Sequence, residues 1–395
     1  MKILHLNMLY PPFLLGGAER SVSMLAEAQA TAGHEVAIAC TTPNAFEEEV
    51  LNGVRVFRMP HGTRFWAEEW PNHSGIERFW RKLTLPLNRT QRHWFGKILD
   101  TVRPDLVHSH SMVDVSTGLW TLARKRGYPL VHTLRDYDLL CADSAMYHHG
   151  RGCGAKCKIV SAGKHRQHRA IAAVAANSAE TLRIHLERGL FSHLHPDNRR
   201  VIWNVSGVSL PPHGSERAPR EGPFTFGYLG RINAEKGVRT LIDAARLLSG
   251  APFRVLIAGK QSRETEPFRA AAKDLPVEFL GFVEPVSFLK CIDVLVIPSI
   301  WAEPLPRTAL EAYANGVPVL GSRAGGTPDV IGQNNDDWLF EPGDPDDLAA
   351  KMAARLAAGR RELPSIDQFR PLLEETTPDV VVRKYDDLYA SLLNA

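Results

Sequence analysis

Short apolar runs alternate with amphipathic segments along most of this chain. Between the first two runs, Ala18, Val22, Leu25 and Ala26 recur at helical spacing, and Gly33 ends that predicted helix. Strand, glycine loop, helix and strand in this order form a βαβ unit, the building block of parallel sheets. In the first half we predict buried strands at residues 2–10, 35–41, 54–60, 104–110, 128–136 and 171–178, closed by 200–204.

Residues 209–222 break this alternation. The stretch "SLPPHGSERAPREG" is rich in proline, glycine and charge, which is typical of a linker or domain boundary. Alternation then resumes, with a helix predicted from about 237 to 248 and an apolar helix face at the chain end. In this second half we predict strands at 224–230, 253–259, 277–283, 293–299 and 317–322.

These patterns predict an α/β protein with two Rossmann-like, doubly wound domains, at residues 1–208 and 209–379. Ligands of such sheets bind beyond the carboxyl ends of the strands. Two sheets with facing carboxyl ends would enclose a central cleft, so the loops that follow the strands are where we look for chemistry.

Composition restricts the class of protein further. The length of 395 residues fits two domains, and 44% hydrophobic with 23% charged residues is typical of a soluble globular protein. A net charge of +3 gives no support for nucleic-acid binding, and five cysteines, an odd number, argue against a secreted disulfide scaffold. Since no apolar run reaches about 18 residues and the N-terminus lacks a signal-peptide pattern, we expect a cytoplasmic protein without a transmembrane helix.

Two loops carry candidate chemistry. In "GYLGRINAEKGV", Arg231 and Lys236 follow a strand and precede a helix, where two cations and a helix N-terminus would favour a diphosphate. An ordinary solvated loop is the alternative. In "WAEPLPRTALEAYANGVPVL", Glu303 lies in a loop, Pro306 fits a first helical turn and Glu311 lies in the second turn. A carboxylate there can accept hydrogen bonds from two sugar hydroxyls; dipole stabilisation or a solvated face are the alternatives.

Taken together, "GGAER…GHEV", "GRINAEKG", "AGK", "FLGFV" and "VLVIPSIWAEPLPRTALEAYANGVPVLGSRAGGTPDVI" resemble glycosyltransferase family 4 over nearly the whole chain. The resemblance implies the GT-B fold and a retaining enzyme that uses a nucleotide sugar. It implies an N-terminal acceptor-binding domain, a C-terminal nucleotide-sugar-binding domain, and a last helix, about 380–395, that crosses back to the N-terminal domain. A phosphate oxygen of the donor would take the acceptor's proton, so no protein nucleophile is required.

The resemblance also implies roles for individual residues. Glu303 and Glu311 are the two glutamates of the E-x7-E motif, the first beside the transferred sugar and the second on the ribose. Arg231 and Lys236 would hold the diphosphate, and the backbone at Val283 would meet the base. We expect catalytic roles for Glu303, Arg231, Lys236, His110 and Arg135, donor contacts at Gly17, Val283, Leu305, Pro306, Arg307, Thr308 and Glu311, and acceptor-side contacts at Gly16 and Asp136.

The chain departs from the family pattern at two places, and a third stretch resembles the motif of a different fold. Arg135 stands where many members have a histidine; it cannot act as a base, and His110 is the nearest candidate for polar support, whereas His132 reads as a packed residue. Pro306 replaces a common glycine and removes one N–H from the donor site. The "DYD" at 136–138 imitates a D-x-D metal motif but lies in the N-terminal half, so acceptor binding or loop solvation is the expectation.

We expect no cofactor and no metal in the reaction, because cations and a helix dipole already cover the leaving group. Cys141, Cys153 and Cys157, with His148, His149, His165 and His168 nearby, could bind zinc. Their spacing is loose, so we expect free thiols in an acceptor loop instead.

Two basic stretches suggest a further partner. Residues 75–97 hold six Lys/Arg and one acid, with Phe79, Trp80, Trp94 and Phe95 among them, and residues 151–169 hold six Lys/Arg and no acid. Basic and aromatic residues together favour an anionic membrane surface, with a nucleic-acid patch or a plain solvated surface as alternatives.

Three other function classes fit less well. A nicotinamide oxidoreductase would need a G-x-G-x-x-G turn, which the chain lacks. A phosphorylase would need a pyridoxal-binding lysine, and none is identifiable. A non-catalytic sugar-nucleotide-binding protein would be expected to lose Arg231, Lys236 or the glutamates. We therefore expect transfer from a UDP- or GDP-linked sugar to a glycan or lipid-linked acceptor in cell-envelope or exopolysaccharide biosynthesis, at the inner membrane face.

Overall fold

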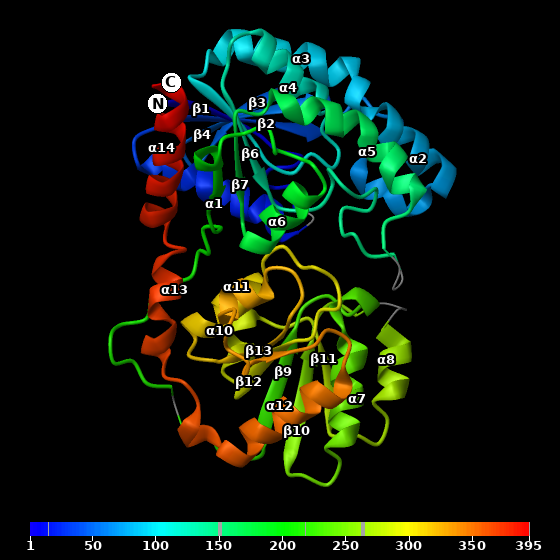
Figure 1. Ribbon diagram of the computed structural model, residues 1–395, viewed down its shortest axis with the longest axis vertical. Helices are drawn as coiled ribbons and strands as arrows, with labels where there is room; N and C mark the ends of the chain where they lie inside the picture. Colours follow the sequence, from blue (N-terminus) through cyan, green and yellow to red (C-terminus); the bar gives the residue numbers. More distant parts are fainter. Residues whose placement is uncertain (15, 149–151, 218, 262–264, 395) are drawn as a thin grey trace. The chain divides into compact units, whose positions relative to one another are not determined.

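The computed structural model describes residues 1–395 except 15, 149–151, 218, 262–264 and 395. Leu15 of the glycine turn, His149, Arg151 and the terminal Ala395 therefore lie outside the described residues. The chain forms two compact units, the first of Met1–Val205 with Thr376–Ala395 and the second of Ser206–Glu375 (Figure 1). The boundary that we predicted after residue 208 falls after Val205 in the structure.

The first unit is built on an eight-stranded sheet in the order β3-β4-β2-β1-β5-β6-β7-β8. Neighbouring strands run parallel except β3 and β4, which pair antiparallel. The strands are β1 (Lys2–Leu6), β2 (Glu35–Thr42), β3 (Glu47–Leu51), β4 (Val54–Pro60), β5 (Leu106–Ser109), β6 (Leu130–Leu134), β7 (Ala173–Ala176) and β8 (Arg199–Val201).

Helices cover this sheet on both faces, as in other doubly wound folds. They are α1 (Gly17–Thr31), α2 (Gly75–Thr84), α3 (Arg89–Val102), α4 (Gly118–Lys125), α5 (Ala155–Gln167), α6 (Ala179–Glu187) and α14 (Pro378–Leu393). The last helix lies alongside α1 (Figure 1), and its apolar face joins Leu25 and the inner strands in one buried cluster. Val381, Tyr385, Leu388 and Tyr389 supply that face at the spacing expected for a helix.

The second unit contains a six-stranded parallel sheet in the order β11-β10-β9-β12-β13-β14. Its strands are β9 (Phe224–Leu229), β10 (Phe253–Ala258), β11 (Val277–Gly281), β12 (Val294–Ile297), β13 (Val319–Ser322) and β14 (Leu339–Phe340). Its helices are α7 (Val238–Leu247), α8 (Glu266–Ala271), α9 (Pro285–Leu289), α10 (Arg307–Ala314), α11 (Thr327–Ile331), α12 (Pro345–Ala358) and α13 (Arg370–Glu374).

Three strand predictions need correction. The first strand ends at Leu6, because the Asn7 side chain bonds to the Leu9 carbonyl and turns the chain before the predicted end. The edge strand β3 was not predicted, since three consecutive glutamates hide it; its Glu48 and Glu49 pair with Arg55 and Arg58 of β4. The two-residue β14 is too short to leave a pattern. None of the helices in the described part of the chain is long and apolar enough to cross a membrane.

Candidate functional site

In the second unit, the strand order reverses between β9 and β12. Ligands of open α/β sheets bind at such a reversal, outside the carboxyl ends of the two strands. The loop after β9 carries Arg231 and Lys236, and the loop after β12 carries Glu303. The topology therefore places all three predicted charges at the position where a ligand is expected.

Backbone contacts lock these two loops together. The Ile300 N–H donates to the Glu235 carbonyl at 3.0 Å. Gly237 has φ +68°, and a Cβ there would lie 1.7 Å from the Pro298 carbonyl oxygen, so only glycine fits. The loop carrying Lys236 is consequently fixed against the loop that leads to Glu303.

The glycine pair after β13 holds the backbone of Glu303 in the same way. Gly325 has φ +57°, and a Cβ there would lie 2.4 Å from the Glu303 nitrogen. The Gly326 N–H donates to the Glu303 carbonyl at 2.7 Å. The reason for glycines at 325–326 is thus close backbone packing against a site residue.

The Glu303 carboxylate is held at both oxygens. Lys236 Nζ lies 2.7 Å from Oε1, and Ser299 Oγ donates to Oε2 at 2.8 Å. The side chains of Lys236 and Glu303 are only 16% and 14% exposed, so their ion pair is well shielded from water. Arg231 is 71% exposed and reaches Glu235 at 3.3 Å, which leaves its guanidinium mostly in solvent, where an anionic ligand can meet it.

The remaining donor-side residues lie around α10 and after β11. Pro306 is the N-cap of α10 and supplies no N–H, while Arg307 and Thr308 open the helix, whose N-terminal dipole is positive. Glu311 lies half-buried in the second turn. Leu305 is buried, and Val283 lies in the turn between β11 and α9. Of this predicted set, the structure brings Lys236 and Glu303 into direct contact.

In the first unit, the strand order reverses between β1 and β5. Gly16 and Gly17 begin α1, after β1, and both are exposed, although Glu19 Oε2 already accepts from the Gly16 N–H at 3.0 Å. His110 follows β5 and Arg135 follows β6. The Arg135 Nε donates to His110 Nδ1 at 3.3 Å, and its guanidinium also bonds to Asn204.

His110 is part of a buried hydrogen-bonded chain that sequence reasoning missed. His5, on β1, bonds to His110 at 2.9 Å and to Gln29 of α1 at 2.7 Å. A guanidinium can only donate a hydrogen bond, so His110 accepts from Arg135 and must donate to the next residue. The same reasoning fixes the donor and the acceptor in every later bond. The order is Arg135, His110, His5, Gln29, Tyr389, His108, Thr133 and Tyr385.

Burial keeps these imidazoles neutral. It lowers the pKa of His5 to about 4, and it holds the pKa values of His108 and His110 well below the usual range. Each ring nitrogen of the three already has a hydrogen-bond partner, and Arg135 adds a positive charge, so the cluster is a poor metal site. His110 is buried and accepts a hydrogen bond from Arg135, which leads us to expect that it acts by positioning Arg135.

The two aspartates of "DYD" have different environments. Asp136 accepts from Ser111 Oγ at 2.6 Å, and burial, together with the nearby Asp138, raises the pKa of Asp136 to about 6. Asp138 is buried and ion-paired with Lys164 and Lys82, so loop solvation is wrong for Asp138. The contacts of Asp136 and Asp138 anchor the loop after β6. Of these two aspartates, Asp136 is partly exposed to solvent and Asp138 is buried.

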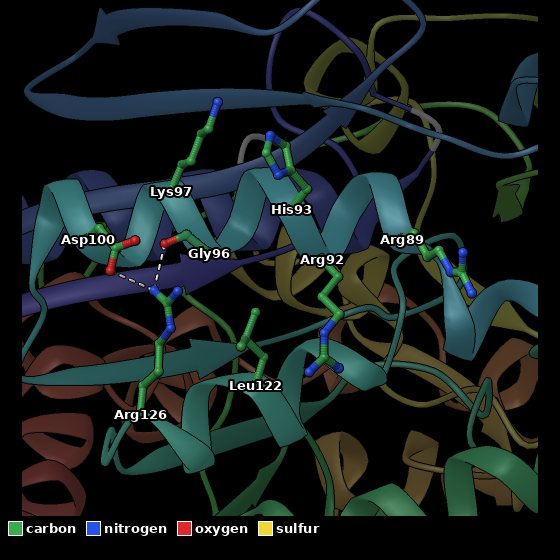
Figure 2. A pocket seen from close by; sticks show the side chains of 8 residues that line it. All are labelled: Arg89, Arg92, His93, Gly96, Lys97, Asp100, Leu122 and Arg126. Atoms are coloured by element: carbon green, nitrogen blue, oxygen red, sulfur yellow. Dashed lines mark hydrogen bonds and ion pairs between the residues drawn. The ribbon is translucent and has the colours of Figure 1, made fainter.

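The basic stretches lie only partly at the surface. Arg81 is buried against Asp114, and Lys82 and Lys164 are buried against Asp138. Other cations gather at α3 and α4 in a groove of about 450 Å³ (Figure 2), where Arg126 pairs with Asp100 at 2.7 Å. The groove is lined by Arg89, Arg92, His93, Gly96, Lys97, Asp100, Leu122 and Arg126.

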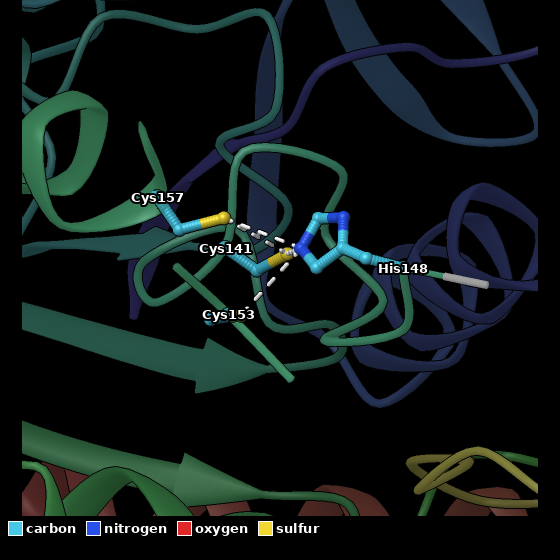
Figure 3. A group of neighbouring side chains, drawn as sticks. All are labelled: Cys141, His148, Cys153 and Cys157. Atoms are coloured by element: carbon cyan, nitrogen blue, oxygen red, sulfur yellow. Dashed lines mark hydrogen bonds between the residues drawn. The ribbon is translucent and has the colours of Figure 1, made fainter. Parts of the chain in front are cut away.

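The three cysteines that we expected as free thiols form no disulfide, and they lie close together at the loop after β6 and the start of α5. Cys141, Cys153 and Cys157 converge on His148 Nε2 (Figure 3), at sulfur–nitrogen distances of 3.4, 3.7 and 3.3 Å respectively. The loose spacing in the sequence is closed by the turn after β6 and by the first turn of α5.

Comparisons with known proteins agree with this architecture. Residues 15–205 match Glycosyltransferase Family 4, and residues 214–363 match Glycosyl transferases group 1. The chain is 27% identical to the "Uncharacterized 42.6 kDa protein in cps region" of Klebsiella pneumoniae, over 84% of this chain and 87% of that protein. It is 29% identical to a glycogen synthase of Mycobacterium tuberculosis, over 91% of this chain and 88% of that protein.

Among solved structures, Anabaena HepE in complex with UDP has the same fold, with a TM-score of 0.68 and 17% identity over 99% of this chain and 100% of that chain. The two family matches cover both units and both candidate half-sites. This chain therefore belongs to the glycosyltransferases of group 1 and family 4, with the GT-B fold.

Proposed function

We propose that this glycosyltransferase is a retaining enzyme that moves a hexose from a UDP- or GDP-linked donor to a glycan or lipid-linked acceptor during cell-envelope or exopolysaccharide synthesis. The observation that carries the proposal is the Lys236–Glu303 pair at the strand reversal of the second sheet. Support for the donor class comes from UDP in the complex of HepE, and support for the pathway from the cps-region relative.

The charges of this half-site suit departure of a nucleoside diphosphate. As the glycosidic bond breaks, negative charge grows on the diphosphate and positive charge on the anomeric carbon. Arg231, Lys236 and the N-terminus of α10 would stabilise the first charge, and the carboxylate of Glu303 the second. Fixed charges act more strongly in the transition state than in the ground state, which is the condition for faster turnover.

A donor panel tests this function. UDP-, GDP- and ADP-linked sugars are added separately, and the melting temperature is measured, because a ligand that binds only the folded protein raises it. The sugar that raises the melting temperature is then offered with glycan and lipid-linked acceptors, and NMR of the product reads the anomeric configuration. A product with the donor's configuration is expected; an inverted product would contradict the retaining mechanism.

A non-catalytic sugar-nucleotide-binding protein of the same fold is the alternative. It would show the thermal shift with a nucleotide sugar and no transfer to any acceptor, and no slow hydrolysis of the donor. Retention of Arg231, Lys236, Glu303 and Glu311 favours the enzyme, since a binding protein has no need to stabilise a breaking bond.

We further propose that the first unit docks on an anionic membrane surface. Ile76 and Trp80 of α2, Leu87 after it and Ile159 of α5 are exposed apolar side chains, and α2 and α5 pack together. Lys156 and Lys158 of α5 add positive charge beside them. Apolar side chains flanked by cations fit the interface of a bilayer that holds anionic lipid.

Vesicle flotation tests the docking surface. The protein should float with vesicles that contain anionic lipid at low salt, and less so at high salt, because salt screens the cations. Trp80→Ala should weaken flotation, whereas Phe282→Ala, which removes an exposed aromatic of the second unit, should not. Failure to float with either lipid composition would leave only the solvated-surface interpretation.

A further inference from the structure

The loop after β6 and the start of α5 bring together four soft ligand atoms. The Sγ atoms of Cys141, Cys153 and Cys157 and the Nε2 atom of His148 all lie within 4.8 Å of one another. Figure 3 shows the three thiols directed toward the same ring nitrogen. One imidazole nitrogen can make one good hydrogen bond, so hydrogen bonding alone does not account for three sulfurs around it.

The distances match those of a tetrahedral metal site. Zn–S bonds of about 2.3 Å and Zn–N bonds of about 2.0 Å set sulfur–sulfur edges of roughly 3.8 Å and sulfur–nitrogen edges of roughly 3.5 Å. The three sulfur–nitrogen distances are 3.4, 3.7 and 3.3 Å, and Cys141 Sγ lies 4.0 Å from Cys157 Sγ. A Cys₃His set with these edges has the dimensions of a structural zinc site.

The surroundings of the four ligands are those of a metal site as well. The other ring nitrogen of His148, Nδ1, lies 3.0 Å from Asp143 Oδ2. Carboxylates commonly bind a metal-ligating histidine in this way and orient its ring. The Asp143 N–H donates to Cys141 Sγ at 3.4 Å, and Ser144 and Met146 adopt φ of +59° and +55° in the turn that wraps this sulfur.

We propose that Cys141, His148, Cys153 and Cys157 bind one structural zinc ion. On binding, the three thiols lose their protons to solvent and four bonds to the metal form, three from sulfur and one from nitrogen. Soft thiolates with one imidazole in a closed tetrahedron favour zinc over calcium or magnesium, which take oxygen ligands. Two of the sulfurs are buried, as a structural site requires, and Lys156 and Lys158 beside Cys157 offset the net negative charge of the filled site.

The site would fix the loop that carries the acceptor-side residues. Arg135 and Asp136 begin this loop, and Cys141 ends its first turn, where its N–H donates to the Tyr137 carbonyl at 2.8 Å. Cys157 lies in the first turn of α5, the helix whose Lys164 pairs with Asp138. Zinc would thus fix the loop to the first turn of α5, and the Lys164–Asp138 ion pair fixes the same loop further along that helix.

Metal analysis of the full-length protein tests this proposal. The protein is expressed with added zinc and purified under reducing conditions, and zinc and iron are counted by mass spectrometry. About one zinc per chain is expected. Cobalt added to the zinc-free protein should give the visible bands and sulfur-to-cobalt charge-transfer absorption of a tetrahedral thiolate site, which requires no variant to fold.

Variants locate the ion. Cys157→Ser and His148→Ala should each retain at least about ten-fold less zinc, whereas Cys291→Ser, which removes an exposed cysteine of the second unit, should retain it fully. Asp143→Asn should bind zinc about 10-fold to 100-fold more weakly in competition with a chelator. A wild-type protein without zinc that also gives no cobalt spectrum, a stoichiometric iron content, or a Cys141–Cys157 disulfide under reducing purification would each overturn the proposal.

Discussion

At the scale of single residues, Glu303 and Glu311 are held very differently. Glu303 accepts from Lys236 and Ser299 in a shielded position, and its backbone is packed against Gly325. Glu311 lies on a helix, half-buried, one turn beyond the loop. A carboxylate fixed from both sides can stabilise positive charge that develops at a nearby carbon, which fits the role proposed for Glu303. For Glu311 we propose a contact with the ribose of the donor.

Substituting the two glutamates should therefore change different kinetic parameters. Glu303→Gln should lower kcat with a smaller effect on the donor KM, because the lost charge stabilises the transition state preferentially. Glu311→Gln should raise the donor KM more than it lowers kcat, because ribose is bound alike in both states. Steady-state kinetics with saturating acceptor measure both; the reverse pattern would show the two roles to be exchanged.

The two loop cations are expected to be needed for turnover. Lys236→Ala and Arg231→Ala should each lower kcat by about 100-fold or more, since each would remove a charge that we propose stabilises the leaving diphosphate. Arg239→Ala is the matched control, because Arg239 lies three residues beyond Lys236, is exposed, and pairs with Asp243 on its own helix, α7. Near wild-type turnover in Lys236→Ala, with folding intact, would refute the diphosphate role.

At the scale of elements, α14 is tied to the first sheet by polar contacts as well as by its apolar face. Tyr389 bonds to His108 at 2.6 Å and to Gln29 at 3.1 Å, and Tyr385 bonds to Thr133 at 2.9 Å. These contacts join the last helix to α1, β5 and β6 within the first unit. The same series of hydrogen bonds begins at Arg135, so the packing of α14 supports the orientation of a candidate site residue.

Removing one hydroxyl from this chain should destabilise the first unit. Tyr389→Phe leaves both His108 Nδ1 and the Gln29 amide without a partner in a buried place, which costs about 1–3 kcal/mol for each such group. Tyr385→Phe is the matched control, since it affects only Thr133 at the end of the chain and should cost less. Urea unfolding measures the loss in free energy of unfolding for both variants. Equal losses would mean that these hydrogen bonds do not depend on one another.

At the scale of the whole molecule, the buried histidines make stability depend on pH. Burial lowers the pKa of His5 to about 4, of His132 to about 3 and of His185 to about 4, whereas an unfolded chain holds them near 6.5. The unfolded state thus binds more protons below pH 6.5. The stability that these groups contribute is complete above about pH 6.5 and is lost as the pH falls toward 4.

Acidification should accordingly unfold the first unit before the second, which holds only the exposed His213. Each buried histidine adds a slope of about 1.4 kcal/mol per pH unit in this window. Asp136 has the opposite effect, because its pKa of about 6 in the folded protein makes the folded state bind a proton more readily than the unfolded state. It is a single group against several histidines. His5→Gln removes one titrating group, which faces His108, His110 and Arg135, and should make the slope shallower. Urea midpoints between pH 7.5 and 5 that stay constant would contradict this account.

The sequence by itself determined most of the buried strands, the two-domain α/β organisation, the family and the positions of the charged residues in loops that follow strands. Local periodicity encodes secondary structure, and the loop motif "GRINAEKG" and the spacing from Glu303 to Glu311 lie within short segments. Ser299 and Gly325 were missed although they adjoin these segments, because their roles depend on which atoms of Glu303 they meet.

Only the tertiary structure decided which polar side chains are removed from water and which ligands converge. Gln29 and Tyr389 meet across 360 positions of the chain, and Lys82 reaches the loop of Cys141 from a helix 60 positions earlier. Neither contact leaves a periodic trace, because burial depends on the elements that pack over a residue and these come from distant segments. The spacing of the cysteines in the sequence did not predict their convergence, because metal binding depends on distances in space and the fold brings these residues together.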